Sequence, residues 1–136
     1  MSNKKIEDVE GIGPAYGAKL TAAGIKDTDS LLAAAGKPAG RKDLAAKADI
    51  PEKLILKFAN KVDLTRIKGI GAEYADLLEA SGVDTVPELA QRVPANLAKK
   101  LAEVNDAKNL TRRVPAESEV ERWVAEAKTL PRAIEY

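Results

Sequence analysis

The sequence contains neither cysteine nor histidine. Without these residues the chain can form no disulfide, offers no thiol nucleophile and lacks the usual zinc ligands. It also lacks the one side chain whose unperturbed pKa suits proton transfer near neutral pH. Carboxylates and lysines remain as candidate catalytic groups, but nothing in their arrangement specifies a substrate. We therefore expect a protein that is not an enzyme and that uses no metal and no cofactor.

Long apolar runs and an excess of charge of one sign are also absent. No stretch approaches the roughly 20 apolar residues of a membrane-spanning helix, and the charged N-terminal residues precede no apolar run of the kind found in signal peptides. We expect a cytoplasmic protein with no membrane partner. The 22 basic and 21 acidic residues give a net charge of +1, whereas dedicated nucleic-acid-binding domains are usually visibly basic.

Aromatic side chains are scarce, and alanine is abundant. Only 5 of the 136 residues are aromatic, whereas 24 are alanine. Alanine has the highest helix propensity, and its small side chain lets helices approach closely. The composition predicts an all-α fold in one compact domain, or in two very small ones.

An internal repeat is the strongest signal in the chain. Residues 9–25 recur 58 positions later as residues 67–83, and eight positions between 9 and 33 are identical in the two copies. A duplication explains this better than chance does. Segments 54–64 and 120–130 resemble each other less closely, with Phe58 and Trp123 as equivalent bulky anchors. We predict two fused repeats of about four to five short helices each, over residues 1–63 and 64–136.

Glycine and proline set the expected helix boundaries, because proline suits the first helical turn and glycine suits the C-cap. Thr28 or Asp29 is the expected cap of the second helix, and residues 34–40 are expected to form a loop. The predicted helices are 14–23, 30–35, 40–48, 51–62, 72–80, 86–92, 94–104 and 118–130.

Both copies of the repeat resemble the helix-hairpin-helix family. The family pattern places apolar residues around a Gly-apolar-Gly turn and an alanine four residues after its second glycine. The chain as a whole resembles a group of uncharacterised bacterial proteins with tandem hairpins of this kind. The matching residues are Ile6, Val9, Gly11, Ile12, Gly13 and Leu20 in the first copy, and Leu64, Ile67, Gly69, Ile70, Gly71, Ala75 and Leu78 in the second.

The resemblance implies that each turn could hold one nucleic-acid phosphate on free backbone amides at the start of a helix, without reading bases. Two segments with a net charge of +4, residues 37–61 and 92–113, could extend such a surface. Weak, sequence-independent DNA binding is therefore the favoured function. The candidate phosphate-binding residues are Gly69, Ile70, Gly71, Arg66, Lys68, Gly11, Ile12, Gly13, Arg112 and Arg113.

Two residues favour a different interpretation. DNA-binding hairpins commonly place a cation at the second position after the turn, and this chain has Ala15 in one copy and Glu73 in the other. The turns could instead simply fasten helices together in a protein-interaction module that binds no nucleic acid. Tyr16 and Tyr74, at equivalent positions, could pack with their hydroxyls at the surface or stack on bases.

Overall fold

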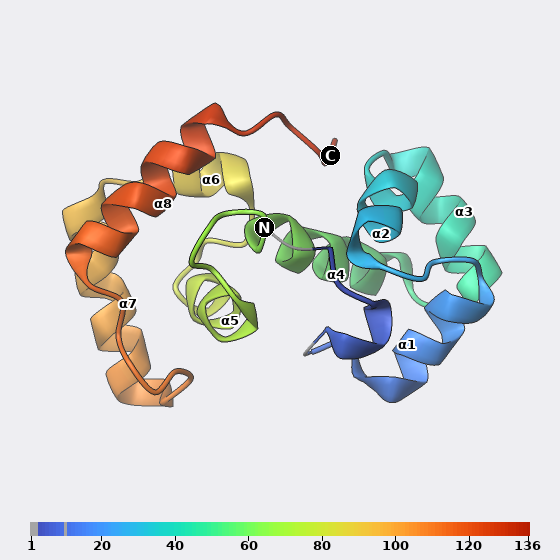
Figure 1. Ribbon diagram of the computed structural model, residues 1–136, viewed down its shortest axis with the longest axis horizontal. Helices are drawn as coiled ribbons and strands as arrows, with labels where there is room; N and C mark the ends of the chain where they lie inside the picture. Colours follow the sequence, from blue (N-terminus) through green and yellow to red (C-terminus); the bar gives the residue numbers. More distant parts are fainter. Residues whose placement is uncertain (1–2, 10) are drawn as a thin grey trace. The chain divides into compact units, whose positions relative to one another are not determined.

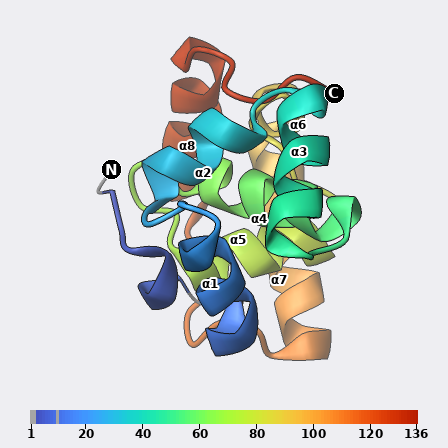
Figure 2. The ribbon, with the colours of Figure 1, turned by 90° about the vertical axis from the view of Figure 1, so that its right-hand side faces the viewer.

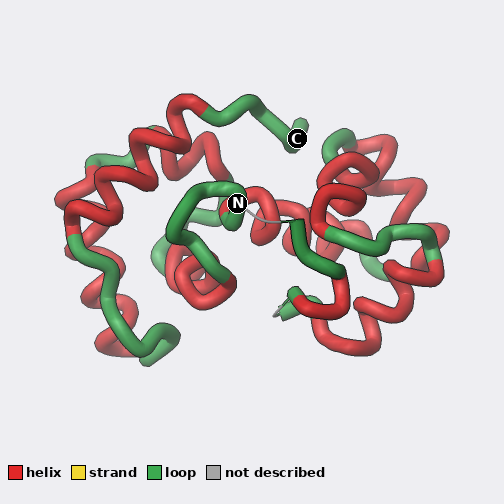
Figure 3. Tube along the Cα trace, viewed as in Figure 1, coloured by secondary structure: helices red, strands yellow, loops and turns green. Residues whose placement is uncertain are grey.

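The computed structural model describes residues 3–9 and 11–136, and in this part of the chain it contains helices and no strand (Figures 1 and 3). The predicted all-α fold class is confirmed. The elements are the 3-10 turn η1 (Ile6–Asp8) and the helices α1 (Gly13–Ala22), α2 (Thr28–Ala35), α3 (Pro38–Ala48), α4 (Glu52–Leu64), α5 (Ala72–Ala80), α6 (Val86–Ala90), α7 (Pro94–Lys108) and α8 (Glu117–Thr129).

The chain divides into two compact units with separate cores. Unit 1 comprises Met1–Asp63 together with Ala133–Tyr136, and unit 2 comprises Leu64–Arg132. Aliphatic side chains dominate both cores, and the bulky aromatic anchors Phe58 and Trp123 are buried in unit 1 and unit 2, respectively. Each unit therefore excludes water from apolar side chains of its own.

In unit 1, α2 packs against α3, and η1 packs against α1 (Figure 2). The α2–α3 corner holds a buried cation, since Arg41 is only 5% exposed and donates a hydrogen bond to the carbonyl oxygen of Ala35 over 2.9 Å. The guanidinium group therefore supplies a hydrogen-bond donor to the last carbonyl group of α2, and its positive charge lies beside the negative end of the helix dipole.

The C-terminal segment Ala133–Tyr136 completes unit 1. Ile134 lies in its core, 1% exposed. The Glu135 N–H donates to the carbonyl oxygen of Gly36 over 2.6 Å, and the Tyr136 hydroxyl donates to the side-chain oxygen of Asn60 over 2.8 Å. Core packing and hydrogen bonds thus both fix this segment to unit 1.

In unit 2, α8 packs against both α6 and α7, and α5 packs against α7 (Figure 1). The face of α8 that carries Val120, Trp123, Val124 and Ala127 is buried in the core. This spacing of three and four residues is that of one helix face, so the sequence pattern of the last helix and its packing agree.

Two expectations about local structure were wrong. The predicted loop 34–40 is mostly helical, because α3 begins at Pro38. Gly40 lies in the first turn of this helix. A β-carbon there would collide with the carbonyl oxygen of Ala34, so glycine permits the close packing of the two segments. The cap of α2 is Asp27, not Thr28 or Asp29, and its carboxylate accepts the Ser30 N–H over 2.8 Å.

Candidate functional site

The two Gly-Ile-Gly turns have closely similar backbones at their first two residues. Gly11 and Gly69 both have a φ of +94°, a conformation that strongly favours glycine. Ile12 and Ile70 are both buried, and each donates its N–H to the carbonyl oxygen three residues earlier, over 3.4 Å and 3.1 Å, respectively. Each turn therefore anchors one apolar side chain in its own unit and exposes the glycine before it.

The turns differ at their second glycine. Gly13 has a φ of +81° and is the first residue of α1, whereas Gly71 has a φ of −96° and is the N-cap of α5. The next residue also differs, because Pro14 has no N–H and Ala72 has one. The first-turn amides of a helix have no partner within it. At this position the turn of unit 2 therefore offers an anion a donor that the turn of unit 1 lacks.

Oppositely charged side chains lie against the two turns. In unit 1, Lys61 of α4 is only 9% exposed, and a β-carbon on Gly11 would collide with its Nζ atom. In unit 2, Oε1 of Glu126, on α8, accepts the backbone N–H of Lys68 over 3.2 Å. A carboxylate thus already takes one amide of the second turn, which opposes a phosphate there.

Aromatic pairs support both turns. The ring centroids are 5.7 Å apart for Tyr16 and Phe58, and 5.3 Å apart for Tyr74 and Trp123, with interplanar angles of 58° and 52°. These separations and tilts are typical of favourable aromatic contacts. The tyrosine rings thus pack against core aromatics, and the Tyr74 hydroxyl donates to the carbonyl oxygen of Arg113 over 3.1 Å.

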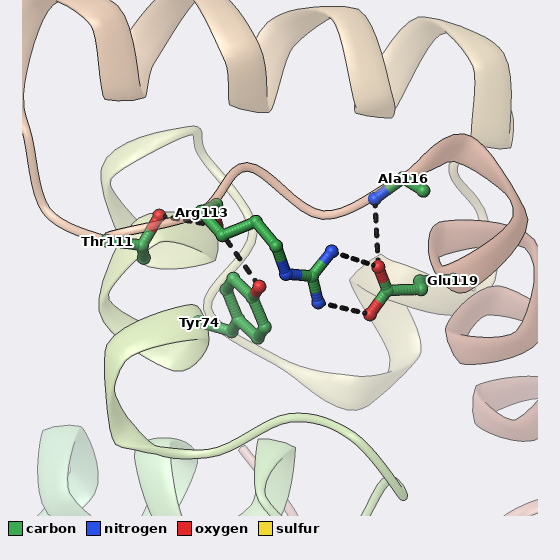
Figure 4. A network of polar contacts seen from close by, with 5 residues as sticks. All are labelled: Tyr74, Thr111, Arg113, Ala116 and Glu119. Atoms are coloured by element: carbon green, nitrogen blue, oxygen red, sulfur yellow. Dashed lines mark hydrogen bonds and ion pairs between the residues drawn. The ribbon is translucent and has the colours of Figure 1, made fainter.

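The cations expected beside the second turn are partly engaged within unit 2. Arg66 donates to the carbonyl oxygen of Pro131 over 3.1 Å, and the side chains of Lys68 and Arg112 are exposed. Arg113 forms a bidentate ion pair with Glu119, with distances of 2.7 Å and 3.0 Å (Figure 4).

The hydrogen bonds from Arg113, and then the one from the Ala116 N–H, lower the pKa of Glu119 to about 2. The same ion pair raises the pKa of the Arg113 guanidinium above its ordinary value. Because Glu119 holds this cation, Arg112 is the more available of the two neighbouring arginines.

The candidate residues belong to three segments of the chain. Gly11, Ile12 and Gly13 belong to unit 1; Arg66, Lys68, Gly69, Ile70 and Gly71 lie just before α5; Arg112 and Arg113 lie between α7 and α8. The Tyr74–Arg113 hydrogen bond brings the backbone of the last group to the first turn of α5.

Sequence reasoning missed Lys61 and Glu126 as neighbours of the turns. Both residues follow an aromatic anchor, Phe58 or Trp123, by three positions, and this spacing was available in the sequence. It places them one helical turn from the anchor, on the same face of the helix. There Lys61 and Glu126 each lie against one of the Gly-Ile-Gly turns.

The described residues include no group of three or more acidic residues placed to hold a metal ion. Nor does any helix among them have the length and apolar character required to cross a membrane.

Comparison with known proteins identifies a family. No curated protein and no solved structure matches the chain. The family described as "Domain of unknown function (DUF4332)" matches residues 10–130, which is most of the chain. The protein therefore belongs to this family.

Proposed function

We propose that this protein is a non-enzymatic, duplicated binding module of the helix-hairpin-helix type that binds nucleic-acid backbones weakly and without sequence preference. The observation that carries the proposal is the similar geometry of the two turns. Their first glycines share a φ of +94°, and the following isoleucine makes the same backbone hydrogen bond in both. A similar exposed turn at the start of two helices suits repeated contact with phosphates.

In its backbone donors, the turn of unit 2 is better suited to a phosphate than the turn of unit 1. Ala72 supplies the amide that Pro14 lacks in unit 1. The side chain of Lys68 is exposed beside the turn, and the positive end of the α5 dipole favours an anion. Contacts of this kind are made to the backbone and not to base edges, so they carry no sequence preference.

Two carboxylates keep the expected affinity low. Glu126 accepts the Lys68 N–H, and Glu73 lies in the first turn of α5. Both would repel a phosphate at this turn. The tyrosines pack against Phe58 and Trp123, so we assign them a packing role and no base stacking.

A salt titration with the full chain and a 20-base-pair duplex tests the proposal. The logarithm of the affinity should fall linearly with the logarithm of the salt concentration, with a slope near −0.9 for each phosphate contact. Lys68→Glu should weaken binding. Glu126→Gln keeps a hydrogen-bond acceptor but removes the charge, so it should strengthen binding by about two- to fivefold.

Glu121→Gln is the matched control, because Glu121 is an exposed carboxylate on the same helix. It should change the affinity less than Glu126→Gln does. No detectable binding at about 50 mM salt would refute the proposal. If the two Glu→Gln substitutions changed the affinity equally, the assignment of a phosphate site to the turn of unit 2 would be wrong.

A protein-interaction module that binds no nucleic acid is the second candidate. The internal pairing of Arg113 with Glu119 favours it, because the ion pair removes a cation from those expected to bind phosphate. In that case both turns would serve only to join helices, and the duplex would not bind at any salt concentration.

A further inference from the structure

The connection between α7 and α8 is longer than the connection between α3 and α4. In unit 1, residues 49–51 join α3 to α4, whereas in unit 2 residues 109–116 join α7 to α8. Both connections start with a left-handed residue, Asp49 with a φ of 56° and Asn109 with a φ of 51°, whose N–H donates to the carbonyl oxygen four residues earlier. After the same kind of cap, the connection in unit 2 is thus five residues longer than the one in unit 1.

Hydrogen bonds from Asn105 hold the first part of this connection. Its side-chain oxygen accepts the N–H groups of Leu110 and Thr111 over 2.8 Å and 2.9 Å, and its amide nitrogen donates to the carbonyl oxygen of Thr111 over 3.1 Å. Asn105 is 9% exposed and Thr111 is 5% exposed. Buried hydrogen bonds of this kind fix the course of the backbone.

The second part of the connection is held by the network around Arg113 (Figure 4). The Arg113 carbonyl oxygen accepts the hydroxyls of Tyr74 and Thr111 over 3.1 Å and 3.0 Å. The guanidinium group is fixed by Glu119, which also accepts the Ala116 N–H over 3.1 Å. The connection is therefore ordered along most of its length by contacts within unit 2.

This ordered segment presents apolar side chains to solvent. Leu110 and Val114 are each 37% exposed, and they are two of the four large hydrophobic residues that the described chain leaves exposed. Arg112 lies between them in sequence and is exposed. No hydrogen bond or ion pair engages its guanidinium within the described residues.

We propose that residues 109–116 form a docking segment for an acidic peptide segment of another protein, with a carboxylate bound by Arg112 and aliphatic side chains packed on Leu110 and Val114. Arginine matches a carboxylate through two parallel hydrogen bonds. A segment that is already ordered loses little conformational entropy on binding.

The chemistry of the segment distinguishes it from a nucleic-acid site or a self-association surface. Exposed aliphatic side chains offer nothing to a phosphate, so Leu110 and Val114 favour a protein ligand over a nucleic acid. A stable homodimer commonly buries about 1,600 Å² in total. Two partly exposed aliphatic side chains and one arginine supply far less, and this area suits a short peptide.

The test uses the full chain and a panel of fluorescently labelled 12-residue peptides. In each peptide two leucines flank a central Glu or Asp, and each has a partner in which Gln or Asn replaces the acid. Fluorescence polarisation should detect binding of the acidic peptides at concentrations up to about 1 mM, and the amide partners should bind at least about fivefold more weakly.

Variants then assign the contact. Arg112→Glu and the double substitution Leu110→Ser with Val114→Ser should each weaken peptide binding at least about tenfold. Lys100→Glu, an exposed charge reversal on α7, should leave it unchanged. Thermal unfolding of each variant verifies that the fold is retained, which is expected because all four side chains are partly or fully exposed.

Three outcomes would overturn the proposal. The first is that no acidic peptide binds, and the second is that binding is indifferent to Arg112, Leu110 and Val114. The third is that Arg112→Glu weakens binding of a 20-base-pair duplex but not of the peptides, which would assign the arginine to a nucleic-acid surface.

Discussion

Replacing Gly69 with alanine tests whether the first glycine determines the turn of unit 2. At a φ of +94° a side chain is strained, at a cost of about 1–2 kcal/mol. The new β-carbon would also lie 3.0 Å from Nε1 of Trp123, whose ring is 2% exposed and has little freedom to move. Overpacking of this kind costs about 1–3 kcal/mol.

The unfolded chain loses conformational freedom when alanine replaces glycine, which offsets about 0.4–1 kcal/mol of that cost. We therefore expect Gly69→Ala to lower the free energy of unfolding by about 1–5 kcal/mol, with a central value of about 3 kcal/mol.

Two other glycines of unit 2 serve as controls that separate strain from collision. Gly82 has a φ of +91°, and its nearest neighbour would be the flexible end of Arg92 at 3.4 Å. Gly82→Ala should therefore cost about 1 kcal/mol, from strain alone. Gly71 has a φ of −96° and open space around it, so Gly71→Ala should change the stability by less than about 0.5 kcal/mol.

Urea unfolding followed by tryptophan fluorescence measures these differences. Trp123 is the only tryptophan of the chain and lies in unit 2, so the signal reports on the unit that carries all three substitutions. If Gly69→Ala destabilised unit 2 no more than Gly71→Ala, the assigned role of the first glycine would be wrong. If Gly69→Ala and Gly82→Ala lowered the free energy of unfolding equally, the contact with Trp123 would make no contribution to the effect of Gly69→Ala.

Two further predictions concern the connection between α7 and α8. Because the folded-state pKa of Glu119 is about 2, below the ordinary 4.5, its ion pair with Arg113 stabilises unit 2 above pH 4.5 and loses this effect as the pH falls from 4.5 toward 2. Acid titrations of urea stability should show this loss in the natural sequence and not in Glu119→Gln. Asn105→Ala leaves the buried Thr111 N–H without its acceptor and should cost about 2–3 kcal/mol in urea unfolding; a loss below about 0.5 kcal/mol would contradict the role assigned to Asn105.

The sequence predicted the helical fold class because its signals are local. Proline at a helix start and glycine after a helix end constrain the backbone wherever they occur, and the helix 72–80 begins and ends at the predicted residues. The prediction of a loop at residues 34–40 was wrong because Gly40 permits close packing against Ala34 within a helix. A single sequence does not distinguish this use of glycine from its use in a turn.

The candidate site was less predictable because the sequence shows charges but not their partners. The sequence presents Arg113 as a cation available to bind phosphate, whereas in the structure it is paired with Glu119. Glu126 and Lys61 could have been found by spacing from the aromatic anchors, but their contacts with the turns depend on tertiary packing. Asn105 gave no local signal, because its partners lie beyond the end of its own helix.

The C-terminal segment Ala133–Tyr136 has a consequence for the order in which the protein can assemble during synthesis. Unit 2 is continuous in sequence, whereas unit 1 takes a core residue, Ile134, from beyond unit 2. A ribosome therefore releases all of unit 2 before unit 1 has its full set of core side chains. A fragment that stops at Asp63 would lack Ile134 and leave its place in the core unfilled. Unit 1 can therefore complete its core only after all of unit 2 has been synthesised.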